Sequence, residues 1–123
     1  MTRIVVVDDD RSTSALIKML LEMEGFTVAT YRTAQAALAE ADIGVAALII
    51  DCHLSGKESG LDLLRSIRQG ETSIDPDVPV IMASGDQRLE GEVNASGADL
   101  FLLKPYSPND LSAHINRLLA AER

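Results

Sequence analysis

Short apolar runs rich in β-branched residues alternate with helical patterns along this whole chain, and this alternation most limits its possible folds. The first run, Ile4 to Val7, is continuously apolar, as in a strand buried on both faces. Further runs predict strands at residues 27–31, 45–50, 78–83 and 100–104. Five strands separated by helices predict an α/β fold: a doubly wound parallel sheet with helices on both faces.

The interval after the first strand has a clear helical pattern. Leu16, Met19, Leu20 and Met23 recur at the spacing of one helix face, and Gly25 stands where a helix would end. A repeated apolar face on a helix normally packs against the protein core. We therefore expect both methionines to be buried.

The other intervals also read as helices, at residues 33–41, 61–68, 85–99 and 107–119. The stretch 85–99 is the weakest, because Gly91 has a low helix propensity. The last helix has a clear start, with Ser107 as N-cap and Pro108 at the first helical position. Its expected buried stripe comprises Leu111, Ile115, Leu118 and Leu119.

Size and charge narrow the class of protein. The 123 residues suit a single domain spanning residues 1–123. The one cysteine, Cys52, excludes an intrachain disulfide and fits a reducing cytoplasm. The apolar run before Asp8 is too short for a signal peptide or a membrane span. A formal charge of -8 argues against direct nucleic-acid binding, which needs a basic surface.

Chemically capable side chains follow four of the five predicted strands. Ligands of doubly wound sheets bind beyond the carboxyl ends of the strands, so these side chains should converge on one edge. Singly, each has an ordinary explanation as a helix cap or a turn residue. The set comprises Asp8, Asp9 and Asp10 after the first strand, Asp51 after the third, Ser84 after the fourth and Lys104 after the fifth.

Together, these side chains suit phosphoryl transfer. Neighbouring carboxylates repel one another, and Mg²⁺, which prefers oxygen ligands, relieves that repulsion and offsets the charge of a phosphoryl group. One carboxylate can attack phosphorus as a nucleophile, a lysine can pair with a phosphoryl oxygen, and a serine hydroxyl can hydrogen-bond another. Gly85 leaves room for a donor to approach.

The chain resembles the response regulator receiver domains (CheY-like) of two-component signal transduction over essentially its full length. This resemblance implies the flavodoxin-like strand order 2-1-3-4-5. The matching motifs are Val5-Val6-Val7-Asp8-Asp9-Asp10, Leu48-Ile49-Ile50-Asp51, Pro79-Val80-Ile81-Met82-Ala83-Ser84-Gly85, and Gly97-Ala98-Asp99 followed by Leu103-Lys104-Pro105-Tyr106.

The resemblance assigns a role to each acidic residue of the set. Asp51 would be the phosphoacceptor. Asp9 and Asp51 would bind Mg²⁺ directly, and Asp8 would act mainly through water. The backbone carbonyl of His53 would be the third protein ligand of the metal.

The resemblance also assigns roles to other residues of the chain and implies its partners. Ser84 would be the switch hydroxyl, Phe101 the switch aromatic, and Lys104 the family's lysine, joined to Pro105 by a cis peptide bond. The chain would be a phosphoacceptor in signalling rather than an enzyme. A histidine kinase or histidine phosphotransfer protein would be the donor, and the fourth helix, fifth strand and last helix would bind a downstream protein or a second copy.

The chain departs from the family pattern after Leu54. The segment Ser55-Gly56-Lys57-Glu58-Ser59 makes the loop one residue longer, because Gly60 lies nine residues past the acceptor, and the usual proline is missing. The side chains of His53 and Asp86 would flank the path of a hydrolytic water. We leave open whether His53 pairs with Asp86 or points to solvent.

Two alternatives compete with this interpretation. The first is a phosphatase, since Asp8-Asp9-Asp10-Arg11-Ser12-Thr13 also resembles the nucleophile motif of haloacid dehalogenases. Such enzymes need another acidic pair after the lysine, where only Asp110 and Glu122 remain. The second is a phosphorylation-independent interaction module of the same fold, which would typically lack the acidic pair, acceptor or lysine. No output domain is visible, so we expect a stand-alone receiver or an excised part.

Overall fold

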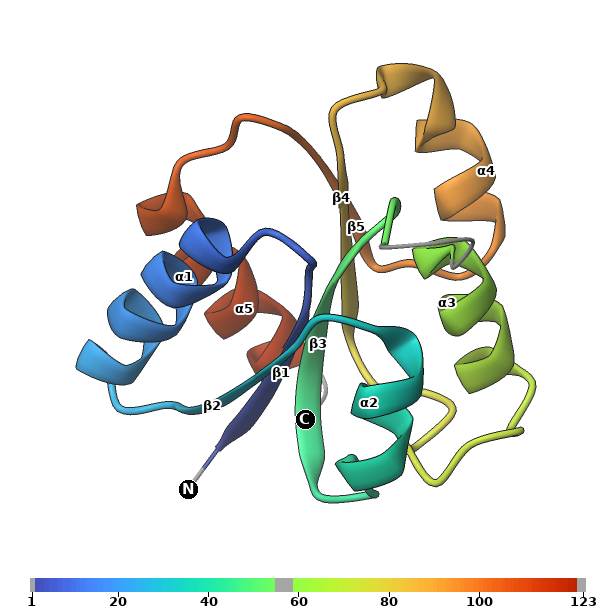
Figure 1. Ribbon diagram of the computed structural model, residues 1–123, viewed down its shortest axis with the longest axis horizontal. Coiled ribbons are helices and arrows are strands. Elements are labelled where there is room, and N and C mark those ends of the chain that lie inside the picture. Colours follow the sequence, from blue (N-terminus) through green and yellow to red (C-terminus); the bar gives the residue numbers. More distant parts are fainter. Residues whose placement is uncertain (1, 55–58, 122–123) are drawn as a thin grey trace.

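The computed structural model describes residues 2–54 and 59–121, which form a parallel sheet of five strands covered by helices (Figure 1). The strand order is β2-β1-β3-β4-β5, which confirms the predicted doubly wound topology. The elements are β1 Arg3–Val7, α1 Arg11–Met23, β2 Thr27–Tyr31, α2 Ala34–Glu40, β3 Val45–Asp51, α3 Gly60–Arg68, β4 Val80–Ser84, the 3₁₀ turn η1 Gln87–Leu89, α4 Glu90–Ala95, β5 Leu100–Leu103 and α5 Pro108–Ala121.

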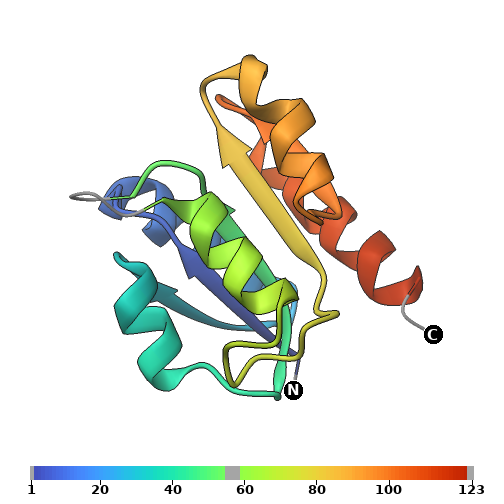
Figure 2. The same cartoon turned by 90° about the vertical axis from the view of Figure 1, so that its right-hand side faces the viewer.

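Alternate residues of the central strands enter two separate cores. In β1, Ile4 and Val6 face the core formed with α1 and α5, while Val5 and Val7 face the core formed with α2, α3 and α4. Figures 1 and 2 show these two helical layers on opposite faces of the sheet. This burial on both faces explains why the strands read as continuous apolar runs.

The predicted core face of α1 is wrong. The helix buries Ile17 and Leu21 against the sheet, and its start is set by the Asp10 side chain, which accepts hydrogen bonds from the first-turn N–H groups. The helix carries two overlapping apolar stripes, and local spacing does not determine which of them faces the sheet. The outward stripe has exposed fractions of 43% at Leu16, 52% at Met19 and 76% at Met23.

The other helices agree with the sequence in their main features. The weak stretch 85–99 divides into η1 and the short helix α4, and Gly97 follows with a positive φ of 103°. Helix α5 begins at Pro108 as predicted, and the Ser107 carbonyl accepts a hydrogen bond from the Leu111 N–H. Within the described residues, no helix combines the length and the apolar character needed to cross a membrane.

Gly60 brings the start of α3 against the end of β3. A Cβ atom at position 60 would overlap the backbone carbonyl of Asp51, so only glycine allows this approach. The Gly60 N–H donates to the Cys52 carbonyl at 3.0 Å, which closes the loop between the two elements. Residues 55–58, where the sequence predicts a longer loop, lie outside the described residues.

Candidate functional site

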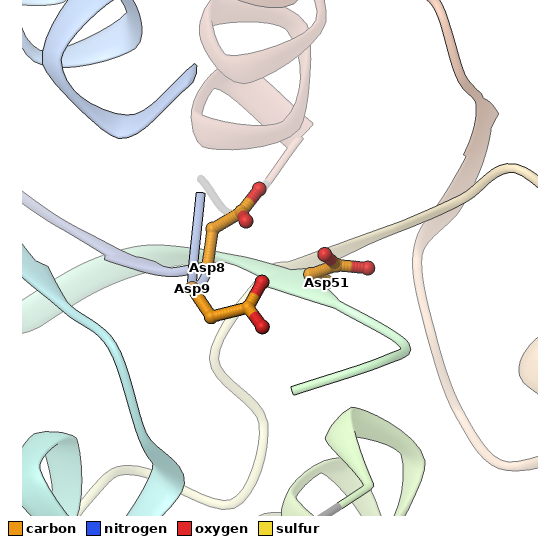
Figure 3. A group of neighbouring side chains, drawn as sticks. All are labelled: Asp8, Asp9 and Asp51. Atoms are coloured by element: carbon orange, nitrogen blue, oxygen red, sulfur yellow. The ribbon is translucent and has the colours of Figure 1, made fainter. Parts of the chain in front are cut away.

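Three carboxylates meet at the carboxyl ends of β1 and β3 (Figure 3). Asp8 and Asp9 follow β1, Asp51 ends β3, and one oxygen from each lies within 4.8 Å of the others. Asp8 is 4% exposed and Asp51 is 8% exposed, while Asp9 is half-buried. An all-oxygen set at this spacing fits a hard divalent cation such as Mg²⁺.

Lys104 joins two of these carboxylates. Its Nζ lies 3.2 Å from Asp8 Oδ2 and 3.1 Å from Asp51 Oδ2. Burial lowers the pKa of Lys104, but its hydrogen bond with Asp51 and the charges of both carboxylates outweigh this effect and raise the pKa overall. The Lys104–Pro105 peptide bond is cis, which confirms the geometry implied by the family resemblance.

The pKa of Asp8 is raised by its surroundings. Burial raises its pKa, and the negative charge of Asp51 acts in the same direction, while the hydrogen bond from Asp10 and the charge of Lys104 oppose them. The Asp10 N–H donates to Asp8 Oδ1 at 2.9 Å. Lys104 pairs with Asp8 and Asp51, and a divalent cation held by the three carboxylates would further lower the repulsion between them.

Ser84 ends β4 and is fully buried. Its Oγ accepts a hydrogen bond from the Asp86 N–H at 3.0 Å. Gly85, between them, is exposed and has nothing within 4 Å of the position where its Cβ would lie. The structure thus brings the predicted hydroxyl to the same sheet edge as the carboxylates.

Asp86 is held by Arg88, a residue that the sequence reasoning missed. Arg88 Nε donates to Asp86 Oδ1 and Nη2 donates to Oδ2, each at 3.0 Å. These hydrogen bonds are the main reason that the pKa of Asp86 is lowered, and the charge of His53 is the weakest contributor. His53 is exposed, and its backbone N–H donates to Asp51 Oδ1 at 3.1 Å. The only sign of this pair in the sequence is an acidic residue two positions before an arginine.

Two further residues connect the site to the core. Phe101 on β5 is half-buried and packs against the core that contains Val93 of α4. Cys52, directly after Asp51, is buried, and burial raises the pKa of its thiol to about 11, with a smaller contribution from the charge of Asp51. The thiol therefore packs as a small apolar group.

Comparisons with known proteins agree on one family. Residues 4–116 match the response regulator receiver domain family. The transcriptional regulatory protein CpxR of Klebsiella pneumoniae is 37% identical over 124 residues, covering 97% of this chain and 50% of CpxR. The chain thus spans about half the length of such curated relatives.

Solved structures agree in fold. The receiver domain of NtrX from Brucella abortus has a TM-score of 0.84 at 31% identity, covering 95% of this chain and 98% of that chain. The BeF3-activated receiver domain of DrrB has a TM-score of 0.85 at 28% identity, covering 100% of this chain and 99% of that chain.

Proposed function

Because this chain belongs to the response regulator receiver family, which acts in two-component signal transduction, we propose that it accepts a phosphoryl group on Asp51. The observation that carries the proposal is the position of Asp51, grouped with Asp8 and Asp9 and in contact with Lys104. The donor would be a histidine kinase or a histidine phosphotransfer protein. The similarities favour neither the phosphatase nor the phosphorylation-independent module.

Mg²⁺ would be held by the carboxylates of Asp9 and Asp51 and the backbone carbonyl of His53. Both oxygens of Asp8 already accept hydrogen bonds, from the Asp10 N–H at 2.9 Å and from Lys104 at 3.2 Å. Asp51 likewise accepts a hydrogen bond at each oxygen, from the His53 backbone N–H and from Lys104, both at 3.1 Å, so a role for Asp8 through water rests on the family resemblance. When bound, Mg²⁺ would offset the negative charge on the phosphoryl oxygens.

Asp51 would act as the nucleophile. One carboxylate oxygen attacks phosphorus while the bond from phosphorus to the histidine nitrogen of the donor breaks. Lys104, which lies 3.1 Å from Asp51, would place its charge on a phosphoryl oxygen. Ser84 Oγ accepts the hydrogen bond from the Asp86 N–H, and its hydroxyl hydrogen would be donated to another phosphoryl oxygen. The open space at Gly85 supports approach of the donor from this side.

Phosphorylation would change the surface formed by α4, β5 and α5. Drawing Ser84 toward the phosphoryl group would disturb the Asp86 N–H bond at the start of η1, which leads into α4. Helix α4 has only six residues, so its own hydrogen bonds resist displacement weakly. Phe101 lies on β5 against the core beneath α4 and would turn inward. This surface would bind a downstream protein or a second copy of the chain.

The acceptor is tested by phosphorylation with acetyl phosphate or a phosphorylated histidine kinase. We expect stoichiometric, Mg²⁺-dependent labelling that Asp51→Asn abolishes while the circular dichroism spectrum is retained. Asp62→Asn is the matched control, since Asp62 is an exposed carboxylate on α3. Stoichiometric labelling of the Asp51→Asn protein at another residue would show that the assignment is wrong.

The metal site is tested by thermal unfolding. Binding to the folded state alone stabilises a protein by about 2.7 kcal/mol at one hundred times the dissociation constant. We expect Mg²⁺ to raise the melting temperature of the wild type, and to raise it far less in Asp9→Asn than in Asp62→Asn. A wild type that does not respond to millimolar Mg²⁺ would contradict the site.

The switch is tested by hydrogen exchange with beryllofluoride, the mimic named for the DrrB receiver domain. The exchange rates of amides in η1 and α4 should change, whereas those in α1 and α2 should not. Unchanged protection across residues 85–99 would remove the basis for a moving α4.

A further inference from the structure

A groove of about 390 Å³ lies between α1 and β2, the edge strand of the sheet. One wall is a stripe of α1 that includes Arg11, Ser14 and Lys18, and the other is the end of β2 with Arg32 beyond it. Asp8 is also among the lining residues, so the groove borders the carboxylate cluster, on the far side of β1 from Asp51. Figure 1 shows α1 lying across this side of the sheet.

The groove concentrates positive charge on an acidic protein. The chain has 11 lysines and arginines against 19 acidic residues. Within residues 2–54 and 59–121, six of these cations form ion pairs with carboxylates, and Arg117 is hydrogen-bonded to His114. The two described cations that remain, Arg11 and Arg32, are both exposed and both line this groove.

The third cation of the groove is already committed to the protein. Lys18 Nζ lies 2.9 Å from Glu22 Oε2 and donates to the Val28 carbonyl at 2.8 Å, which ties α1 to β2. The negative charge of Asp8, which also lines the groove, is partly offset by Lys104 at 3.2 Å. The groove therefore presents two guanidinium groups whose charge no carboxylate of the described chain neutralises.

We propose that this groove binds a phosphate dianion through Arg11 and Arg32. Two monovalent cations match the charge of one dianion, and the planar guanidinium group binds phosphate oxygens in pairs. Either a free phosphate compound or the phosphorylated donor that approaches Asp51 would supply this phosphate. Asp51 is not among the residues that line the groove, so the proposed site does not include it.

The test is a titration with inorganic phosphate, followed by ¹H–¹⁵N correlation spectra. The buffer contains no Mg²⁺, and sodium chloride keeps the ionic strength constant. We expect saturable shifts at the amides of Ser14, Tyr31 and Arg32. Losing one charge-assisted hydrogen bond of about 1.4 kcal/mol corresponds to a tenfold change in affinity, so Arg11→Gln and Arg32→Gln should each weaken binding about tenfold.

Arg117→Gln is the matched control, since it removes an exposed arginine on α5 and makes the same change in net charge. Its affinity for phosphate should stay within about twofold of the wild type, because the site is local and screened. Shifts that fail to saturate, or an equal loss in Arg117→Gln, would overturn the proposal. Retained affinity in both groove variants would also overturn it.

Phosphotransfer kinetics distinguish the two sources of the phosphate. If the groove binds the donor, Arg11→Gln and Arg32→Gln raise the KM for the phosphorylated donor protein, and inorganic phosphate competes with it. If it binds a free compound, the KM is unchanged, and phosphoserine produces the same amide shifts as phosphate. Asp51→Asn should bind phosphate in the groove normally, so a failure of the phosphoacceptor assignment remains distinguishable from a failure of this one.

Discussion

Arg68, in the last turn of α3, joins three segments that are distant in sequence. Its Nη1 donates to the carbonyls of Pro76 at 2.8 Å and Val78 at 2.7 Å, and its Nε donates to the Gly97 carbonyl at 2.9 Å. Its Nη2 lies 3.1 Å from Asp99 Oδ2, and the same oxygen accepts from the Val80 N–H at 2.8 Å. The side chain is 20% exposed, but the bonds to Pro76, Gly97 and Asp99 lie at the surface, and the bond to Val78 is part-buried.

We expect Arg68→Met to destabilise the fold by about 3–4 kcal/mol. Each hydrogen bond to a charged group contributes about 1.5–3 kcal/mol when buried, and partial exposure reduces the sum over the three carbonyl bonds. Methionine keeps the length and helix propensity of the side chain, so the loss reflects the bonds rather than α3 itself. The assay is urea unfolding, in which the midpoint should fall while the slope m stays constant.

Arg65→Met is the matched control, one turn earlier on the same helix. Arg65 is 42% exposed and forms ion pairs only with side chains, Glu92 at 2.9 Å and Asp62 at 3.5 Å. Exposed pairs of this kind contribute about 0–1 kcal/mol. A loss below about 1 kcal/mol in Arg68→Met, or equal losses in the two variants, would refute the reasoning.

Two further experiments test the packing around the candidate phosphoacceptor. Gly60→Ala should lower the free energy of unfolding by more than about 2 kcal/mol, because the new Cβ overlaps the Asp51 carbonyl. Gly91 has open space around it, so Gly91→Ala should stabilise α4 by about 0.5–1 kcal/mol. Urea unfolding measures both changes, and a loss well below about 2 kcal/mol in Gly60→Ala would contradict the clash. The thiol of Cys52, with its pKa raised to about 11 by burial, should resist a maleimide at pH 8 until urea unfolds the chain. Rapid labelling of the folded protein would contradict its burial.

The sequence predicted the sheet correctly, and it predicted which side chains lie at the carboxyl ends of its strands. The apolar runs indicated strands buried on both faces, and the same pattern placed Asp8, Asp51, Ser84 and Lys104 at the carboxyl ends of those strands. In a parallel sheet those ends share one edge, so residues far apart in sequence meet without further information. The cis bond before Pro105 was expected only through the family resemblance.

The contacts around the site required the tertiary structure. The Asp86–Arg88 pair is local in sequence, but short acid–arginine spacings are common on protein surfaces and do not by themselves indicate an ion pair beside Ser84. The network of Arg68 and the groove of Arg11 and Arg32 join segments whose proximity depends on how α3 and α1 pack on the sheet.

Helix α1 shows most clearly what the sequence determines and what only the tertiary structure determines. By itself the sequence determined that residues 11–23 form an amphipathic helix, because that property depends on spacing within the segment. It did not determine whether Met19 or Ile17 lies on the buried side, since the two apolar stripes overlap. Only the packing of Ile17 and Leu21 against Ile4 and Val6 decides the rotation of the helix, because burial is a property of two surfaces in contact and not of one segment.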